Sequence, residues 1–240
     1  MARLLDGKTA LVTGVSHDGQ IGQAVAQILA RHGATLGIAA RSQTDVEARA
    51  KELEVEGASV LALPADLAQE TQVQQLVERV LKKYGRIDTL INLAGGLTRY
   101  KRVADHTVDD WNAEVSNNLL TAFLCSRAVF PLMRDSGGGC IVNFARAGRP
   151  QANMVAYNCA KAGIEALTQT LALEGRDAKV RVNAVAPGLV DTASNITAMK
   201  PKDLTKWARR EDIAETVLFL VSPAAQGITG QIIAVPGWGI

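Results

Sequence analysis

The sequence predicts a doubly wound α/β fold, a seven-stranded parallel sheet with helices on both faces. Short apolar runs alternate with longer segments of helical periodicity along all 240 residues. The runs are almost continuously apolar, which is typical of parallel strands covered on both faces. A glycine-rich segment directly follows the first run. No long linker separates these units, so one domain is expected over residues 1–240, with a short substrate lid around 193–210.

The elements follow in order from these patterns. Short apolar runs predict strands at 9–13, 35–39, 60–63, 87–93, 140–144, 180–185 and 231–235. Apolar residues at helical spacing, such as Ile21, Val25 and Leu29, predict the helices between them, at 20–32, 47–55, 71–84, 109–133, 155–174 and 212–221. Right-handed crossovers place the ligand beyond the carboxyl ends of such strands.

Composition narrows the class of protein. Hydrophobic residues make up 48% and charged residues 21%, and the net charge is +2, so a substantial core is expected and nothing global indicates a nucleic-acid partner. Three cysteines without metal-ligand spacing predict reduced thiols and no metal site. The start carries no apolar signal segment, and no run approaches the roughly 18 apolar residues of a membrane span. A cytoplasmic protein without membrane contact is expected.

The glycine-rich segment predicts a phosphate site. It runs from Thr13 to Gly22 between the first strand and the first helix. Glycines allow close backbone approach to a pyrophosphate, and the helix N-terminus offers free N–H groups and a positive dipole end. The alternative is an ordinary turn, but the strand-to-helix position favours phosphate binding.

Arg41 predicts the form of the nucleotide. NAD sites usually carry an acid near the end of the second strand, where it binds the ribose 2′-hydroxyl. Residues 23–44 contain no Asp or Glu, and that strand is followed by Arg41 and Ser42. A guanidinium there suits a 2′-phosphate, so NADP(H) is the expected cofactor. The alternative is a solvated arginine at a strand end.

Several ordered motifs resemble those of the short-chain dehydrogenase/reductase family, and the resemblance covers essentially the whole chain. They are the glycine loop; Asp66 and Leu67 after the third strand; Asn92-Leu93-Ala94-Gly95 after the fourth; Trp111 followed by Asn118; Tyr157-x-x-x-Lys161; the Pro187-to-Thr192 turn; and Thr229-Gly230-Gln231. The pattern is similar to the 3-oxoacyl-[acyl-carrier-protein] reductase branch. It implies a Rossmann-type fold and an NADP(H) oxidoreductase acting on a small-molecule or acyl-thioester substrate.

The resemblance also implies which residues bind the cofactor. These are Gly14, Ser16, Gly19, Ile21, Gly22, Arg41, Asp66, Leu67, Asn92, Ala94, Gly95, Tyr157, Lys161, Pro187, Gly188, Val190 and Thr192.

Tyr157 and Lys161 are the candidate catalytic pair. They are four residues apart on a predicted helix, so their side chains share a face. A phenol is a weak acid at neutral pH, and a nearby ammonium lowers its pKa. The resemblance implies that Tyr157 is the acid and base, that Lys161 holds the nicotinamide ribose and that Asn118 supports a water chain.

One residue of the family pattern is absent. The family usually has a serine after the fifth strand, but residues 141–150 contain neither Ser nor Thr, and the alignment places Phe144, Ala145 or Arg146 at that position. Ala145 and Arg146 are therefore the candidate substrate contacts. Arg146 could donate to a developing alkoxide or bind a substrate carboxylate, or simply point to solvent. Asn143 is the other nearby polar group, and a structural hydrogen bond is the expectation for it.

Two properties follow less directly. The 109–133 and 155–174 helices carry more apolar residues than one buried stripe needs, including Leu119, Phe123, Leu124 and Val129. This excess predicts a homo-oligomer, and the resemblance implies a tetramer.

Residues 200–210 carry five basic side chains and one acid, typical of a solvated face or of a lid that attracts an acidic partner. The alternative function is a cofactor-binding subunit with little turnover, which the missing serine favours.

Overall fold

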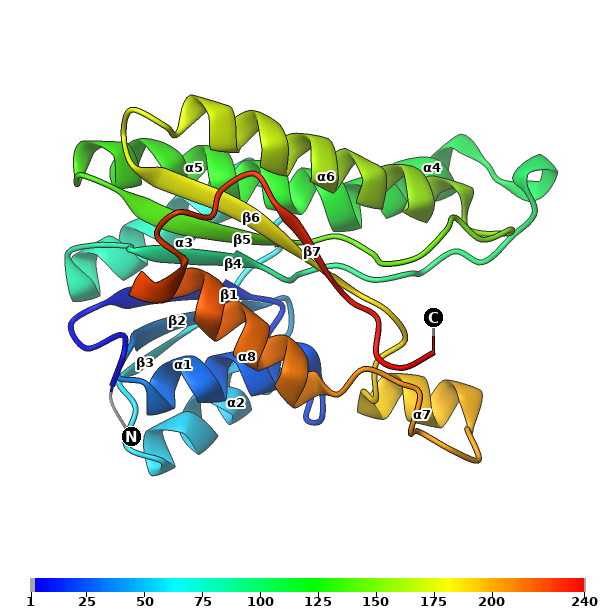
Figure 1. Cartoon of the computed structure of the whole chain (residues 1–240), viewed down its shortest axis with the longest axis horizontal. Coiled ribbons are helices and arrows are strands. Elements are labelled where there is room, and N and C mark those ends of the chain that lie inside the picture. Colours follow the sequence, from blue (N-terminus) through cyan, green and yellow to red (C-terminus); the bar gives the residue numbers. More distant parts are fainter. Residues whose placement is uncertain (1–2, 240) are drawn as a thin grey trace.

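The computed structural model describes residues 3–239 and confirms the predicted sheet. Seven parallel strands are arranged in the order β3-β2-β1-β4-β5-β6-β7 (Figure 1). They are β1 (Thr9–Thr13), β2 (Thr35–Ala40), β3 (Val60–Pro64), β4 (Thr89–Asn92), β5 (Gly139–Phe144), β6 (Val180–Pro187) and β7 (Ile232–Val235). The order reverses direction between β1 and β4, and in open parallel sheets ligands bind at such a switch point.

Helices cover both faces of the sheet (Figure 1). They are α1 (Ile21–Arg31), α2 (Gln43–Val55), α3 (Glu70–Tyr84), α4 (Val108–Val115), α5 (Thr121–Asp135), α6 (Val155–Glu174), α7 (Ala193–Met199) and α8 (Arg210–Val221). One apolar cluster joins α1, α2 and α8 to one face, and a second joins α3 and α5 to the other. In β1, Val12 belongs to the first cluster and Leu11 to the second, so neighbouring residues of one strand fill two cores.

Several element boundaries differ from the prediction by a few residues, and two of these differences have an evident local reason. Helix α2 begins at Gln43 rather than at residue 47, because the Ser42 hydroxyl caps it by accepting a hydrogen bond from the N–H of Asp45 at 3.2 Å. Strand β4 is shorter than the predicted 87–93 segment. Its partner strands pair only with residues 89–92, and the chain then turns away towards the strand-end edge.

The predicted 109–133 helix is not continuous. It begins at Val108, where Thr107 and Asp110 form a capping box. A π-helical turn, Ser116–Leu120, then separates α4 from α5. Such a turn is wider than an α-helical one and is frequent at functional sites. It carries Asn118.

The apolar face of this segment is less exposed than its sequence predicts. Leu124 and Val129 are buried against the sheet, so they contribute to the core and not to an outer patch. Leu119 lies against Gly163 of α6. Phe123 is 40% exposed and remains as an apolar surface residue.

Residues 3–239 show neither a membrane-spanning helix nor a metal-binding cluster. No helix in that range has the length and apolarity to cross a membrane. Nor does it contain a group of three or more His, Cys, Asp or Glu side chains that could hold a metal ion. Cys125 and Cys140 are buried, Cys159 is exposed, and all three are free thiols.

Candidate active site

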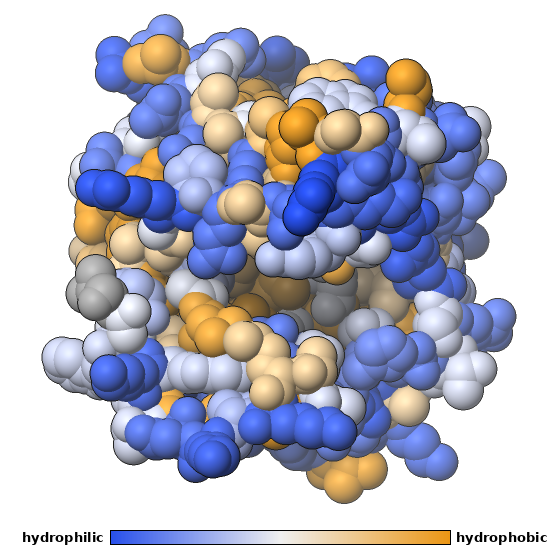
Figure 2. Space-filling view, turned by 90° about the vertical axis from the view of Figure 1, so that its right-hand side faces the viewer, coloured by the Kyte–Doolittle hydropathy of each residue, from blue (hydrophilic) through white to orange (hydrophobic). Residues whose placement is uncertain are grey.

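The predicted site residues come from loops at the carboxyl ends of the strands and from the adjoining ends of α4 and α6. Figure 2 looks onto this side of the molecule and shows a hollow with an apolar floor between two largely hydrophilic rims. The hollow lies where the fold predicts a ligand.

The glycine-rich loop forms a close-packed cradle. A Cβ atom on Gly22 would lie 2.3 Å from the carbonyl oxygen of Gly14, and one on Gly14 would lie 2.8 Å from the backbone nitrogen of Ala94. Gly14 and Gly19 also have positive φ angles, which favour glycine. Gln20, which precedes α1, makes no side-chain capping bond, so the first N–H groups of α1 remain directed at the space before the helix.

Thr13 ties this loop to the segment after β4. Its hydroxyl accepts hydrogen bonds from the N–H groups of Leu93 at 3.0 Å and Ala94 at 3.1 Å, and donates to the carbonyl of Ile91 at 3.1 Å. The glycine loop and the Asn92–Gly95 segment are therefore held together as one wall of the site. Thr13 was identified only as the start of the motif, since nothing in the sequence marks its cross-strand role.

Tyr157 and Lys161 share one face of α6, as predicted. The Lys161 ammonium lies 5.7 Å from the centre of the Tyr157 ring and donates a hydrogen bond to the carbonyl of Phe144 at 2.8 Å. Burial lowers the pKa of Lys161 to about 8, and the nearby carboxylate of Glu114 opposes this shift. A lysine with this pKa is charged at neutral pH but close to its titration range.

The expected lowering of the Tyr157 pKa is not found. Burial raises the pKa of the phenol; the positive charge of Arg146 acts in the opposite direction, and the negative charge of Glu114 adds to the rise. Desolvation of the phenolate outweighs the effect of the Arg146 cation. The Tyr157 phenol is therefore firmly protonated at neutral pH.

Asn118 is fixed by its side chain. Its amide oxygen accepts the Gly96 N–H at 2.9 Å, and its amide nitrogen donates to the carbonyls of Gly96 at 3.1 Å and Glu114 at 2.9 Å. A Cβ on Gly95 would lie 2.7 Å from the same amide oxygen. The π-helical turn thus joins the loop after β4 to the helices that carry the catalytic candidates.

Glu114 is a buried carboxylate that sequence reasoning does not identify. It accepts hydrogen bonds from the N–H and the hydroxyl of Thr98, both at 2.5 Å, and from the Asn118 amide at 3.3 Å. The signal in the sequence is only an acid four residues before Asn118, which is common on solvated helices.

The loop after β5, where the family resemblance leads us to expect a serine, carries no Ser or Thr between residues 141 and 150. Ala145 is buried. Asn143 is fully buried and both of its amide atoms are used, since it accepts from Asn92 and donates to Thr168, each at 2.9 Å. Arg146 is half-buried and donates to the carbonyl of Arg149 at 2.8 Å. Arg146, the next residue after Ala145, is therefore a polar side chain of this loop that is not committed to the core.

Three of the predicted cofactor-binding residues, Asn92, Asp66 and Arg41, have side chains in three different environments. The Asn92 amide points into the protein, where it donates to Asn143 and to Ser126, each at 2.9 Å. Asp66 accepts from the N–H of Ala68 at 3.1 Å. Arg41 is exposed at the end of β2, free to meet a ligand phosphate.

The last predicted segment, Pro187–Thr192, leads into α7. Thr192 is buried and caps α7 by accepting from the N–H of Asn195 at 3.2 Å. The first residues of α7 contact the glycine loop, because the Ala193 N–H donates to the carbonyl of Gly19 at 2.9 Å and Ser194 donates to Gln20 at 3.1 Å. The predicted lid region therefore borders the phosphate cradle.

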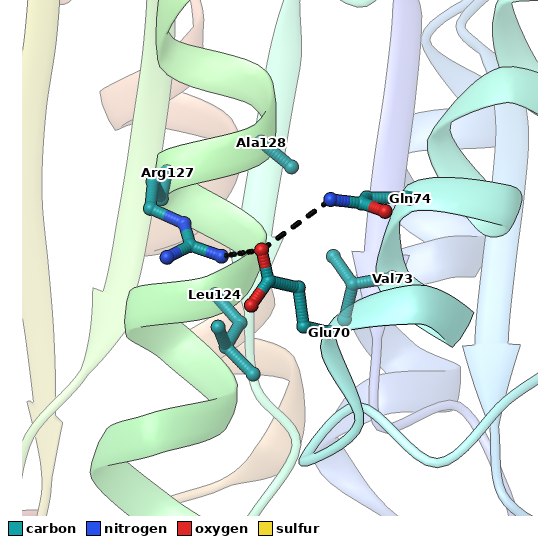
Figure 3. Close-up of a pocket in the computed structure, with 6 residues that line it drawn as sticks. All are labelled: Glu70, Val73, Gln74, Leu124, Arg127 and Ala128. Carbon is teal, nitrogen blue, oxygen red and sulfur yellow. Dashed lines mark hydrogen bonds and ion pairs between the residues drawn. The ribbon is translucent and has the colours of Figure 1, made fainter.

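A separate hollow lies between α3 and α5. Figure 3 shows Glu70 of α3 paired with Arg127 of α5 and accepting a hydrogen bond from Gln74 at 3.3 Å. Its remaining lining residues are Val73, Leu124 and Ala128. None of the catalytic candidates contributes to it, so it is not the reaction site.

Comparisons with known proteins agree with this geometry. Residues 14–237 match a family model described as enoyl-(acyl carrier protein) reductase. A 3-oxoacyl-[acyl-carrier-protein] reductase of Synechocystis sp. is 38% identical over 245 residues, which cover 97% of this chain and 97% of that protein.

Two solved structures are similar over nearly their whole length. A hydroxysteroid dehydrogenase from Escherichia coli has a TM-score of 0.88 and 30% identity, and covers 96% of both chains. A 7α-hydroxysteroid dehydrogenase in complex with NADH and 7-oxo glycochenodeoxycholic acid has a TM-score of 0.90 and 29% identity, covering 98% of this chain and 95% of that one.

Proposed function

Since the chain belongs to the short-chain dehydrogenase/reductase family of oxidoreductases, we propose that it is an NADP(H)-dependent enzyme that reduces a carbonyl or oxidises the matching alcohol, with Tyr157 as acid and base. The observation that carries this proposal is the Tyr157–Lys161 pair on one face of α6 beside Asn118. Those three side chains lie at the strand-end edge that also holds the glycine cradle. A protein that only bound nucleotide would have no chemical need for all three.

The residues present fit a dinucleotide. The backbone at Gly14 and Gly22 is packed more closely than any side chain would allow, and the open N-terminus of α1 would receive the pyrophosphate. Arg41 would bind a 2′-phosphate through its guanidinium. Lys161 would hold the nicotinamide ribose, and the Pro187–Thr192 turn would contact the nicotinamide amide.

The chain's own residues then supply the proton chemistry. When bound, the nicotinamide supplies or accepts the hydride. Tyr157 donates its phenol proton to the carbonyl oxygen during reduction and accepts a proton from the alcohol during oxidation. Because burial raises the pKa of Tyr157, its phenol carries at neutral pH the proton that reduction requires, whereas oxidation requires its phenolate.

The substrate is proposed from two features. A 3-oxoacyl thioester or a small ketone fits the relatives, one of which is a 3-oxoacyl-[acyl-carrier-protein] reductase. The basic segment 200–210, exposed over most of its length, would attract an acidic carrier or a phosphorylated substrate. We further propose a cytoplasmic homotetramer, as the family resemblance implies.

A second candidate function rests on the buried Ala145. No hydroxyl stands where the family usually has one, and Asn143 is committed to Asn92 and Thr168. Loss of one donor to a developing oxyanion typically costs about 10²–10³ in rate. The alternative is therefore a cofactor-binding subunit with little turnover.

A turnover screen decides between the two. Purified protein is assayed with NADPH and with NADH against ketones and 3-oxoacyl thioesters, alongside Tyr157→Phe and the control Tyr84→Phe, whose hydroxyl lies on α3 near the carbonyl of Leu36. We expect Tyr157→Phe to lose nearly all turnover and keep NADPH binding, while Tyr84→Phe keeps both. Wild-type protein that binds NADPH but turns over none of these substrates would favour the second function.

A further inference from the structure

Glu114 is an unusual side chain for its position. Among residues 3–239 only three charged side chains are buried, Asp110, Glu114 and Lys161, and Glu114 is the one with no exposed surface at all. A buried charge is costly unless it has partners. Asp110 has its own partners, because Lys101 and Arg99 contact it at 2.7 and 3.0 Å. Glu114 makes no salt bridge of this kind, so its partners lie elsewhere.

The contacts of Glu114 lead to the catalytic candidates. Its hydrogen bonds join the loop after β4, through Thr98, to the π-helical turn, through Asn118. Helix α4 packs against α6, the helix that carries Tyr157 and Lys161. The buried carboxylate thus belongs to a polar cluster. Helix α4 contributes Glu114, the π-helical turn contributes Asn118, and the loop after β4 contributes Thr98.

The negative charge of Glu114 also acts on both catalytic candidates of α6. The negative charge of Glu114 raises the pKa of Lys161 against the effect of burial and also raises that of Tyr157. The other charged group acting here is Arg146, in the loop after β5, whose influence falls on Tyr157. Among residues 3–239, Lys161 is the only buried cationic side chain, and Glu114 is the acid whose negative charge acts on it.

We propose that Glu114 is an additional positioning residue of this active site, whose buried carboxylate fixes Asn118 and the Thr98 loop and keeps Lys161 in its charged form. The proposal rests on the proposed function, since Lys161 is the group that Glu114 serves. A desolvated ammonium close to its titration range loses its proton at a lower pH when no anion lies near it.

The test measures Lys161 directly, in the absence of nucleotide and substrate. The ¹³Cε resonance of Lys161 in ¹³C-lysine protein, assigned through its absence in Lys161→Met, is titrated in wild type and in Glu114→Gln. Removal of the charge should lower the midpoint by about one pH unit or more. Glu114→Asp, which keeps the charge, should lie nearer the wild type. Asp110→Asn removes another buried acid from the same helix and should leave the midpoint unchanged.

NADPH affinity gives a second readout. If the Lys161 midpoint falls by about one unit, binding by Glu114→Gln should be about five-fold weaker than wild type near pH 8 and nearly equal to it near pH 6. An unchanged Lys161 midpoint in folded Glu114→Gln would overturn the proposal and leave Glu114 a structural residue. Lack of wild-type turnover would instead count against the proposed function, because the titration needs no turnover.

A double variant covers the case in which Glu114→Gln does not fold. Removing both charges, in Glu114→Gln with Lys161→Met, leaves no unpaired buried ion and should restore folding and a higher melting temperature than Glu114→Gln alone. If Lys161→Met raises the melting temperature no more in the Glu114→Gln background than in the wild type, the two charges are not coupled and the proposal is wrong.

Discussion

Replacing Lys161 by methionine should abolish function but stabilise the folded protein at neutral pH. At high pH the same substitution should destabilise it. The side chain is buried, and burial holds its pKa at about 8 against an ordinary 10.5. A folded-state pKa below the unfolded value means that the unfolded chain binds the proton more tightly. Charged Lys161 therefore destabilises the folded protein fully below pH 8, and this penalty disappears as the pH rises through about 10.5.

The magnitude follows from the shift and from one hydrogen bond. A depression of this size corresponds to about 3 kcal/mol of destabilisation at pH 7. Methionine also loses the bond to the Phe144 carbonyl, which costs about 1–2 kcal/mol. We expect Lys161→Met to be about 1–2 kcal/mol more stable than wild type at pH 7 and less stable by a similar amount near pH 10.5.

The assay is urea unfolding of the nucleotide-free protein at fixed concentration and several pH values. Lys51→Met, a change of the same kind on the exposed surface of α2, is the control and should show no pH-dependent difference from wild type. NADPH binding and turnover should be lost in Lys161→Met only. The stability advantage of Lys161→Met over the wild type should decrease from pH 7 to pH 10. An advantage that stays constant over this range would refute the reasoning.

Three further predictions concern the cofactor, the missing serine and assembly. Arg41→Ala should weaken NADPH binding by roughly 10–150-fold and leave NADH binding nearly unchanged; tighter binding of NADH than NADPH by the wild type would contradict the assignment. Ala145→Ser should raise turnover on simple ketones, whereas Arg146→Ala should cut it at least about ten-fold without changing NADPH affinity if Arg146 replaces the serine; rates unchanged in both would place this loop outside the active site. Light scattering at micromolar concentration should detect a tetramer, and a monomer would contradict the expected assembly.

The strands and the shared helix face of Tyr157 and Lys161 could be predicted because their signals are local. Apolar runs mark strands wherever they pair, and Tyr157 and Lys161 are four residues apart on one helix. The burial of Glu114 could not be predicted, since an acid on a helix is usually solvated and only the packing of α4 on α6 excludes water. The raised pKa of Tyr157 has the same origin: sequence identifies the neighbouring cations but not the loss of solvent.

The capping of α2 and the break in the 109–133 helix are intermediate cases. Ser42 lies directly before the first turn of α2 and could have marked its start. The π-helical turn has no comparable signal. It also explains in part why this segment looked too apolar for one buried stripe, because Leu124 and Val129 after the turn face the sheet.

That wide turn also sets how much variation in length the chain can accept here. Asp110, Glu114, Asn118 and Ala122 recur every four residues and all are buried. In a regular helix of 3.6 residues per turn such a series drifts by about 40° at each step, and the additional residue in Ser116–Leu120 compensates for the drift. A one-residue deletion between 116 and 120 would rotate α4 by about 100° relative to α5. The contacts of Glu114 with Asn118 and Thr98 would then be lost, so this short stretch should be intolerant of insertions and deletions even where single substitutions are accepted.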